Sequence, residues 1–181
     1  MFQSLVYSEA KFSNCGLYRI SLLIRISPTN RKVLFIGLNP SIANESIHDP
    51  TTKRLIGFCK AWDYGTLLVV NLFSRVGSSP KILKHTCNPV GELNDIEIKK
   101  RLSSWAYDPY WDLWLGWGAN GKFKNRNLEV LDCIKHFWKI RSKNYPHSKG
   151  PLTIGLTKGG EPKHPLYLSR NLVLRPFDCC L

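Results

Sequence analysis

The chain has 181 residues, of which 26 are Lys or Arg and 13 are Asp or Glu, for a formal net charge of +13. Hydrophobic residues make up 43% and charged residues 22%, which excludes a disordered chain and is typical of a globular protein with one sizeable core. The excess of positive charge favours a polyanionic partner, nucleic acid or an anionic membrane, over a surface that is basic only for solubility.

The sequence predicts neither a membrane span nor a secretion signal. No segment approaches the about 18 consecutive apolar residues that a transmembrane helix requires. The N-terminus also lacks the basic segment and the following apolar segment of a signal peptide. We therefore expect a cytoplasmic protein without a membrane partner, and the sequence leaves protein partners open.

The six cysteines predict no metal site. They lie at positions 15, 59, 87, 133, 179 and 180, and no two of them form a C-x-x-C pair. Their separations suit neither zinc nor an iron–sulfur cluster. We expect reduced thiols, several of them buried, and neither a metal nor another cofactor.

In chain order, strand patterns alternate with helix patterns. Residues 1–14 are polar and irregular, and we expect them, like 178–181, to be loosely ordered. An alternating segment at 17–26 predicts an edge or antiparallel strand. Apolar runs predict buried strands from Lys32 into Gly37 and at 66–73, 112–118 and 151–156. Helical patterns lie at 50–62, 92–105 and 123–140, and a long polar loop covers 74–89.

Two features describe the helices further. Asp49 followed by Pro50 predicts a helix start, because the carboxylate accepts free N–H groups and Pro is tolerated at the first helical position. The helical spacing predicts inward faces at Leu55, Phe58 and Cys59, at Leu93, Ile96, Ile98 and Leu102, and at Leu128, Leu131, Ile134 and Phe137.

The alternation of strands and helices implies right-handed crossovers and a mostly parallel sheet. We predict one α/β domain that covers residues 1–181. Its fold would be a three-layer α/β/α sandwich with a four-stranded, mostly parallel sheet, to which an N-terminal edge strand or hairpin is added.

Polar residues follow the predicted strand ends. Asn39, Asn71, the 116–121 turn and His164 could meet in one crevice, because ligands of open α/β sheets bind outside the carboxyl ends of the strands. An Asn amide suits reading a nucleobase edge or holding a water, and a His can donate to a developing oxyanion. Taken singly, the two Asn residues could cap loops and His164 could be a surface turn residue. The chain contains no G-x-S-x-G elbow, no Walker A loop and no dinucleotide-binding fingerprint.

Ordered motifs run through nearly the whole chain. They are Phe12-Ser13-x-Cys15-Gly16-x-Tyr18-Arg19, Gly37-Leu38-Asn39-Pro40-Ser41-x-Ala43, Asp49-Pro50-Thr51, Val70-Asn71-Leu72-Phe73, Pro89-Val90-Gly91, Asn94-Asp95, Trp117-Gly118-Ala119 and Gly155-Leu156-Thr157-Lys158-x-Gly160-x-Pro162-x-His164-Pro165-Leu166-Tyr167. In this order they resemble a bacterial and phage family known as domain of unknown function 1643. That resemblance implies no activity.

A more distant resemblance is to the uracil-DNA glycosylase superfamily, which has a four-stranded parallel sheet flanked by helices. The segment 37–40 is similar to the motif that positions the hydrolytic water, and 68–71 to the strand whose terminal Asn reads the flipped base. The segment 113–118 resembles the apolar strand that ends in Trp-Gly, and His164-Pro165 resembles the start of the motif whose His stabilises the departing base. This chain continues with Leu166-Tyr167 instead of Ser-Pro-Leu, so neither insertion of this loop into DNA nor uracil as the substrate is implied.

The second resemblance implies a DNA glycosylase that flips a modified, damaged or mismatched base out of DNA and hydrolyses its N-glycosidic bond, in repair or phage defence. Asn39 and His164 would be catalytic, and Asn71 would pair with the base edge. The other expected base-binding residues are Gly37, Leu38, Pro40, Ser41 and the stacking Phe73, for which Trp62 and Tyr64 are alternatives. Expected phosphate contacts are Arg54, Arg75, Lys122, Lys124, Arg126, Lys158 and Lys163.

Two other functions stay open at this point. One is a glycosidase of free nucleosides or nucleotides, which would have a closed pocket and turnover that is insensitive to salt. The other is a module that binds a nucleic-acid base without cutting it.

Overall fold

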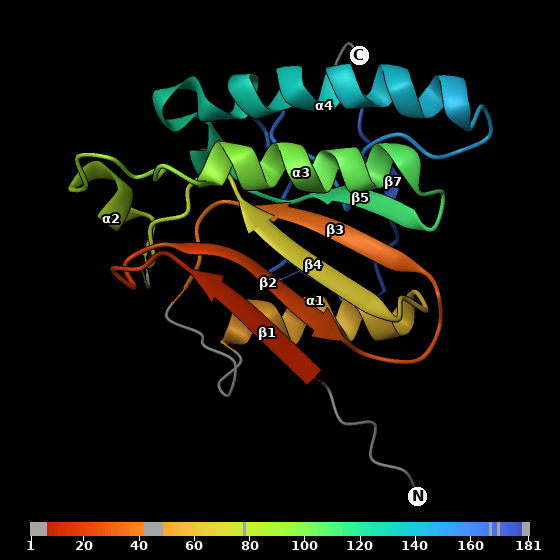
Figure 1. The fold of residues 1–181 in the computed structure, drawn as a ribbon, viewed down its shortest axis with the longest axis horizontal. Coiled ribbons are helices and arrows are strands. Elements are labelled where there is room, and N and C mark those ends of the chain that lie inside the picture. Colours follow the sequence, from red (N-terminus) through yellow and green to blue (C-terminus); the bar gives the residue numbers. More distant parts are fainter. Residues whose placement is uncertain (1–6, 42–48, 78, 167, 170, 179–181) are drawn as a thin grey trace, which may run out of the picture.

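The computed structural model describes residues 7–41, 49–77, 79–166, 168–169 and 171–178, and Figure 1 shows its helices and strands. A seven-stranded sheet has the order β1-β2-β4-β3-β5-β6-β7. The strands are β1 (Tyr7–Phe12), β2 (Arg19–Arg25), β3 (Lys32–Gly37), β4 (Thr66–Asn71), β5 (Trp111–Leu115), β6 (Leu152–Thr153) and β7 (Arg175–Pro176). The helices are α1 (Pro50–Ala61), α2 (Lys81–Lys84), α3 (Asn94–Tyr107) and α4 (Arg126–Asn144), and a 3-10 helix, η1 (Ala119–Asn125), precedes α4.

The sheet is mixed. The pairs β3–β4, β3–β5 and β5–β6 are parallel, whereas β1–β2, β2–β4 and β6–β7 are antiparallel. The expected α/β class is confirmed, but the expected four-stranded, mostly parallel sheet is not, because seven strands form a sheet in which both pairings occur. Residues 7–12, expected to be loosely ordered, form β1 in an N-terminal hairpin with β2.

The strands β3 and β4 form the middle of the core because they are apolar on both faces, as buried parallel strands are. In β3, Leu34 and Ile36 belong to a cluster with side chains of α3 and α4, and Val33 and Phe35 belong to a cluster with side chains of α1. Helices therefore cover both faces of the sheet, α1 on one and α3 and α4 on the other (Figure 1).

Several predicted elements differ in length. The expected strand at 151–156 is reduced to Leu152–Thr153, because the Thr153 hydroxyl donates to the Gly155 carbonyl at 3.0 Å and the chain turns there. The expected helix at 123–140 begins only at Arg126, since Lys124 and Asn125 have positive φ, and it continues to Asn144. The long loop at 74–89 contains the short helix α2.

The predicted inward faces are partly wrong. Leu55, Phe58 and Cys59 of α1 are buried as expected. Leu93, Ile96 and Leu128, by contrast, are exposed by 44%, 65% and 56%. The first two lie before and within the first turn of α3, and Leu128 lies in the first turn of α4. In these turns the buried residues are polar or charged instead, Asn94 and Glu97 in α3 and Arg126 and Asn127 in α4. None of the helices in the described part of the chain combines the length and the apolar composition of a transmembrane segment.

Candidate functional site

A crevice lies at the carboxyl ends of β3 and β4. Gly37 and Asn71 are register partners in these parallel strands, so both strands end at the same edge of the sheet. An inner pocket of about 40 Å³ opens beside an outer pocket of about 300 Å³. Both pockets are lined by Leu38, Asn39, Ser41, Thr51 and His164, and the inner one also by Asn71. The three polar residues that the strand ends suggested thus line one crevice.

The backbone at Asn71 is fixed by hydrogen bonds from Asn94, whereas the amide nitrogen of its side chain is free to bind a group in the inner pocket. The Asn94 amide donates to the carbonyl oxygens of Asn71 (3.1 Å) and Leu72 (3.0 Å), which fixes the end of β4. The Asn71 side chain is buried, and its Nδ2 has no hydrogen-bond partner among the described residues. Because an unpaired buried donor costs about 1–3 kcal/mol, a ligand or water in the inner pocket is its natural partner.

Asn39 presents an acceptor to the crevice. Its Nδ2 donates to the carbonyl oxygens of Pro40 and Gly77, at 3.2 Å each. These two bonds use both amide protons and fix the orientation of the group, which leaves Oδ1 as the atom that can accept a hydrogen bond from a bound water.

His164 lies where the inner and outer pockets meet. Its Nδ1 accepts from the Leu166 backbone N–H at 3.3 Å, so the neutral ring carries its proton on Nε2. Burial lowers the pKa of His164, and the charge of Asp49 opposes this shift. The ring is therefore a neutral hydrogen-bond donor near pH 7, which is the form that can stabilise a departing anion without losing its proton.

The loop that carries His164 is anchored by Glu161. This buried carboxylate accepts from the Trp117 indole N–H at 2.6 Å and from the Asn127 amide at 2.9 Å. Gly118 donates its N–H to the Pro162 carbonyl at 2.8 Å, and a Cβ at Gly118 would lie 3.3 Å from the Cβ of His164. The expected strand at 112–118 is β5 (Trp111–Leu115), so Trp117 and Gly118 lie just beyond its end. They support the His164 loop, a role that the sequence did not indicate.

Seven residues that line the inner pocket were not expected there, and three of them, Arg19, Phe35 and Asp49, bring charge or an aromatic ring. Arg19 is buried, and burial lowers its pKa to about 10 against the charge of Asp49. Asp49 caps α1 as predicted, since it accepts the Thr52 N–H at 2.8 Å, but its position in the crevice was missed. The sequence contained a basis for predicting this position, because Asp49 lies in the segment that connects the end of β3 to the start of α1.

The expected base-binding residues divide into two groups. Gly37, Leu38 and Ser41 line the crevice, whereas Pro40 does not line either pocket. Phe73 does not fit the predicted stacking role, because it is fully buried and packs against Phe123, with ring centroids 5.8 Å apart.

The two alternative aromatics do not line the crevice either. Trp62 and Tyr64 pack with the α1 cluster in the core, outside both pockets. Phe35 lines the inner pocket in their place, from within β3.

The expected phosphate contacts also divide. Arg126 is unsuited to the role, because its buried guanidinium pairs with Asp95 and with Glu129 (2.7 Å) and donates to the Leu72 carbonyl (2.9 Å). Arg54 and Arg75 stack on neighbouring rings outside the crevice. The exposed residues are Lys122, Lys124, Lys158 and Lys163.

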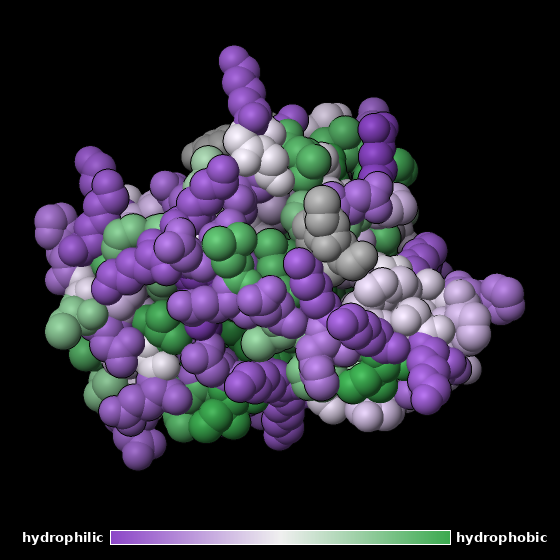
Figure 2. Space-filling view, turned by 90° about the horizontal axis from the view of Figure 1, so that it is seen from above, coloured by the Kyte–Doolittle hydropathy of each residue, from purple (hydrophilic) through white to green (hydrophobic). Residues whose placement is uncertain are grey.

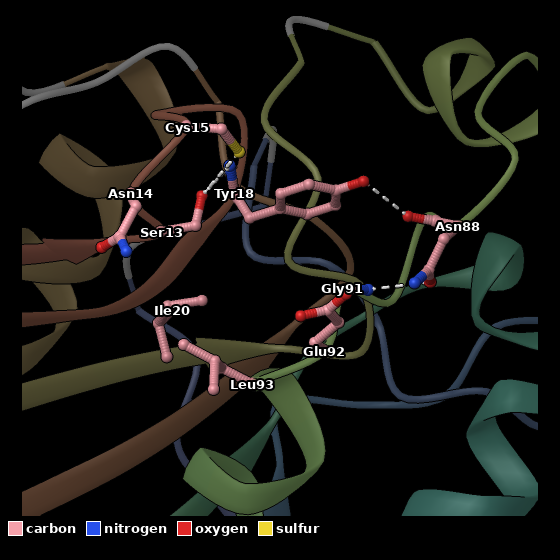
Figure 3. A pocket seen from close by; sticks show the side chains of 9 residues that line it. All are labelled: Ser13, Asn14, Cys15, Tyr18, Ile20, Asn88, Gly91, Glu92 and Leu93. Atoms are coloured by element: carbon pink, nitrogen blue, oxygen red, sulfur yellow. Dashed lines mark hydrogen bonds between the residues drawn. The ribbon is translucent and has the colours of Figure 1, made fainter.

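A second hollow, of about 480 Å³, lies between the β1–β2 turn and the start of α3 (Figure 3). Its polar groups largely bind one another: Tyr18 donates to the Asn88 carbonyl at 3.0 Å, and Cys15 lies 3.2 Å from the Ser13 hydroxyl. The Ser13 hydroxyl lowers the pKa of the Cys15 thiol. The hollow contains none of the predicted site residues, and its larger size alone does not make it the better candidate.

Cys15, Cys59, Cys87 and Cys133 are free thiols. Cys179 and Cys180 lie outside the described residues. Among the described residues, no three His, Cys, Asp or Glu side chains are grouped so that they could hold a metal ion.

Gly37 is expected to be indispensable for the crevice. A Cβ at this position would lie 2.8 Å from Asn71 Oδ1 and 3.0 Å from the Phe35 ring, so Gly37→Ala displaces one of them and lowers the free energy of unfolding by about 1–3 kcal/mol. Gly57→Ala is the matched control. Nothing lies within 4 Å of its new Cβ, and Ala in a helix is favoured by about 1 kcal/mol. Urea unfolding of both variants measures the difference, and equal stability would contradict this packing.

His164 should make the protein less stable in mild acid. Its folded pKa is depressed, so the unfolded chain binds a proton first as the pH falls. The stabilisation from the neutral ring is complete above the ordinary pKa of 6.5 and is lost as the pH falls towards the lower folded value. Thermal unfolding from pH 7.5 to 5 should therefore show a smaller decrease in Tm for His164→Asn than for the wild type. An equal decrease would mean that His164 is not buried in its neutral form.

The comparisons with known proteins give one match. A family described as "Protein of unknown function (DUF1643)" matches residues 19–166 of the chain. No curated protein and no solved structure matches it significantly.

Proposed function

The chain belongs to the DUF1643 family, whose description names no activity, and we propose from its site that it hydrolyses the N-glycosidic bond of a modified, damaged or mismatched base in DNA. The observation that carries the proposal is the crevice itself. Asn39, Asn71 and His164 come from three separate parts of the chain, and each offers the crevice the group that one step of this reaction needs.

Each step of the proposed hydrolysis is assigned to one side-chain group of the crevice. The unpartnered Nδ2 of Asn71 is a donor for an acceptor on the base edge. Asn39 Oδ1 orients a water, and neutral His164 donates from Nε2 to the base as negative charge develops on it. The outer pocket, with about 300 Å³, reaches the size range of small-molecule sites, whereas the inner pocket suits water.

Positive charge at the rim supports DNA as the substrate. Lys122 and Lys124 lie in η1, next to Ala119 and Asn120 of the outer pocket, and Lys158 and Lys163 lie in the loop that leads to His164. Lys122 donates to the Gly159 carbonyl at 2.9 Å, so the two basic segments are neighbours. Lysines around such an opening can hold the phosphates on either side of a flipped nucleotide.

The distribution of surface charge gives a control for this rim. Hydrophilic side chains cover much of the face seen from the α4 side (Figure 2), and Lys139 and Lys143 of α4 are exposed but do not line the crevice. Lys139 and Lys143 carry the same charge as the rim lysines but lie away from the crevice, so they serve as a control for the effect of net charge.

The test of the proposed function is base release. Purified protein is incubated with single- and double-stranded oligonucleotides that carry a broad panel of modified and mismatched bases, and the released bases are identified by mass spectrometry. We expect release of at least one base, and at least a 100-fold lower single-turnover rate for His164→Ala, because a preorganised oxyanion donor contributes about that much. Release of no base from the whole panel would overturn the proposal. Turnover of mononucleotides alone would make the protein a nucleotide glycosidase.

Charge reversal at the rim should weaken DNA binding and reduce its salt dependence. For the double variant Lys158→Glu/Lys163→Glu, we expect the slope of log K against log salt to fall by about 2, since each phosphate contact contributes about 0.9. Lys139→Glu/Lys143→Glu changes the net charge equally and should leave the slope nearly unchanged. Fluorescence anisotropy at several salt concentrations measures both, and equal effects of the two pairs would place the DNA elsewhere.

A further inference from the structure

Asp49 has the position and the hydrogen bonds of a fixed carboxylate in the inner pocket. Its Oδ1 accepts the Thr52 backbone N–H at 2.8 Å. Its Oδ2 accepts the Ser41 hydroxyl and, at 3.3 Å, the Thr52 hydroxyl. A carboxylate has about four acceptor positions, of which the described residues occupy three. The group is thus oriented, and it retains the capacity to accept a proton from a water.

Asp49 shares the inner pocket with charged and polar side chains. Arg19 and His164 line the same inner pocket, and both interact electrostatically with Asp49. The buried Nδ2 of Asn71, which has no partner among the described residues, also lines this pocket. An unpaired buried donor indicates that something polar is bound here. The pocket volume of about 40 Å³ admits a water, which needs about 10–15 Å³. A whole base is too large for it, so a base in the adjoining outer pocket reaches the inner pocket, and Asn71, only with its edge.

Asn39 cannot remove a proton from a water, whereas the Asp49 carboxylate can. Both protons of its amide are donated to backbone carbonyls, and its neutral Oδ1 orients a water without taking a proton from it. We propose that Asp49 is the general base that removes the proton from the attacking water, an inference that rests on the proposed hydrolysis of an N-glycosidic bond.

The step balances as follows. The water oxygen forms a bond to C1′ of the sugar, and one water proton passes to the Asp49 carboxylate. The C1′–N bond breaks, and its electron pair leaves with the base, whose negative charge His164 Nε2–H stabilises. The base then takes a proton from solvent, and Asp49 releases its proton to solvent. Before it takes this proton, the negative charge of Asp49 also stabilises the cationic character that develops on the sugar.

Asp49 is also the N-cap of α1, and that structural role alone would explain its presence. The substitution Asp49→Asn separates the two roles. Asn caps a helix about as well as Asp and keeps an oxygen for the Thr52 N–H, but it cannot act as a base. Asp49→Ser, another good N-cap, is the second variant in case Asn perturbs the fold.

Two measurements test the proposal. The first is the single-turnover rate of base release as a function of pH for the wild type, Asp49→Asn and Asp49→Ser. We expect at least a 100-fold fall for both variants and loss of the acidic limb of the rate profile, since a general base contributes about 10²–10⁴-fold. The second is the pKa of His164, followed by NMR in the absence of any substrate. It should fall further in Asp49→Asn, because a neighbouring negative charge that favours the protonated ring is gone.

The two proposals fail in different ways. If the wild type releases no base from the panel, the proposed function fails, and the role of Asp49 as its general base fails with it. The pKa of His164 still shows then whether the two side chains interact. If the wild type is active and both variants, with unchanged Tm, retain its rate within about threefold, Asp49 is only a helix cap and this inference is overturned.

Discussion

Asn71→Ala should abolish most of the base release while leaving the protein nearly as stable as the wild type. The side chain makes no described hydrogen bond through Nδ2, so its removal deletes an unpaired buried donor instead of breaking a contact. We expect the free energy of unfolding to change by about 1 kcal/mol or less. The rate should fall about 100-fold or more, the usual cost of losing one preorganised donor.

The exchange Asn71→Asp goes further, because it replaces the donor with a second acceptor. This substitution should change which base the protein releases. A site whose polar groups pair with the edge of one base rejects another base that leaves those groups unpaired. Asn144→Ala is the matched control, because Asn144 is exposed at the end of α4 and does not line the crevice. Wild-type activity in Asn71→Ala would remove this residue from the site.

Glu161→Ala should be among the most destabilising single substitutions near the crevice. It leaves the Trp117 indole N–H and the Asn127 amide without their shared buried acceptor, and each unpaired donor costs about 1–3 kcal/mol. We expect a loss of about 2–5 kcal/mol in urea unfolding. The rate of base release should fall as well, because the His164 loop loses its anchor.

Glu161→Gln is the control for this loss. Its amide oxygen still accepts one of the two bonds, so the loss of stability should be about half as large. Equal losses for the two variants would show that the charge of Glu161, and not its pairing with Trp117 and Asn127, stabilises the loop.

The sequence predicted those parts of the fold in which the pattern extends over several residues. The apolar runs of β3 and β4 and the Asp49-Pro50 start of α1 were found within one or two residues. The strand β7 is only two residues long, and β1 is largely exposed, so neither of them leaves a recognisable pattern. Of the strand that the apolar run at 151–156 predicted, only the two residues of β6 form. The antiparallel pairs β1–β2, β2–β4 and β6–β7 make the sheet larger and more antiparallel than expected.

The same limit applies to the crevice. Asn39, Asn71 and His164 were predicted because each follows a strand, and parallel strands end at one edge of a sheet. Side-chain direction was not predictable. Phe73 lies two residues after the end of β4 and points into the core, whereas Phe35 reaches the inner pocket from within β3. Arg126 resembled a surface cation in sequence, but its partners Asp95 and Glu129 make it part of the fold.

The central claim is that this crevice binds a nucleobase, and side-chain amide NMR tests it directly. Free bases and short modified oligonucleotides are titrated into protein labelled with ¹⁵N, and the Asn71 side-chain amide, assigned through Asn71→Ala, is followed. We predict that a ligand whose base is released shifts the Asn71 amide and the His164 ring together, with one dissociation constant. Binding that leaves both signals unchanged while shifting residues elsewhere would contradict the claim.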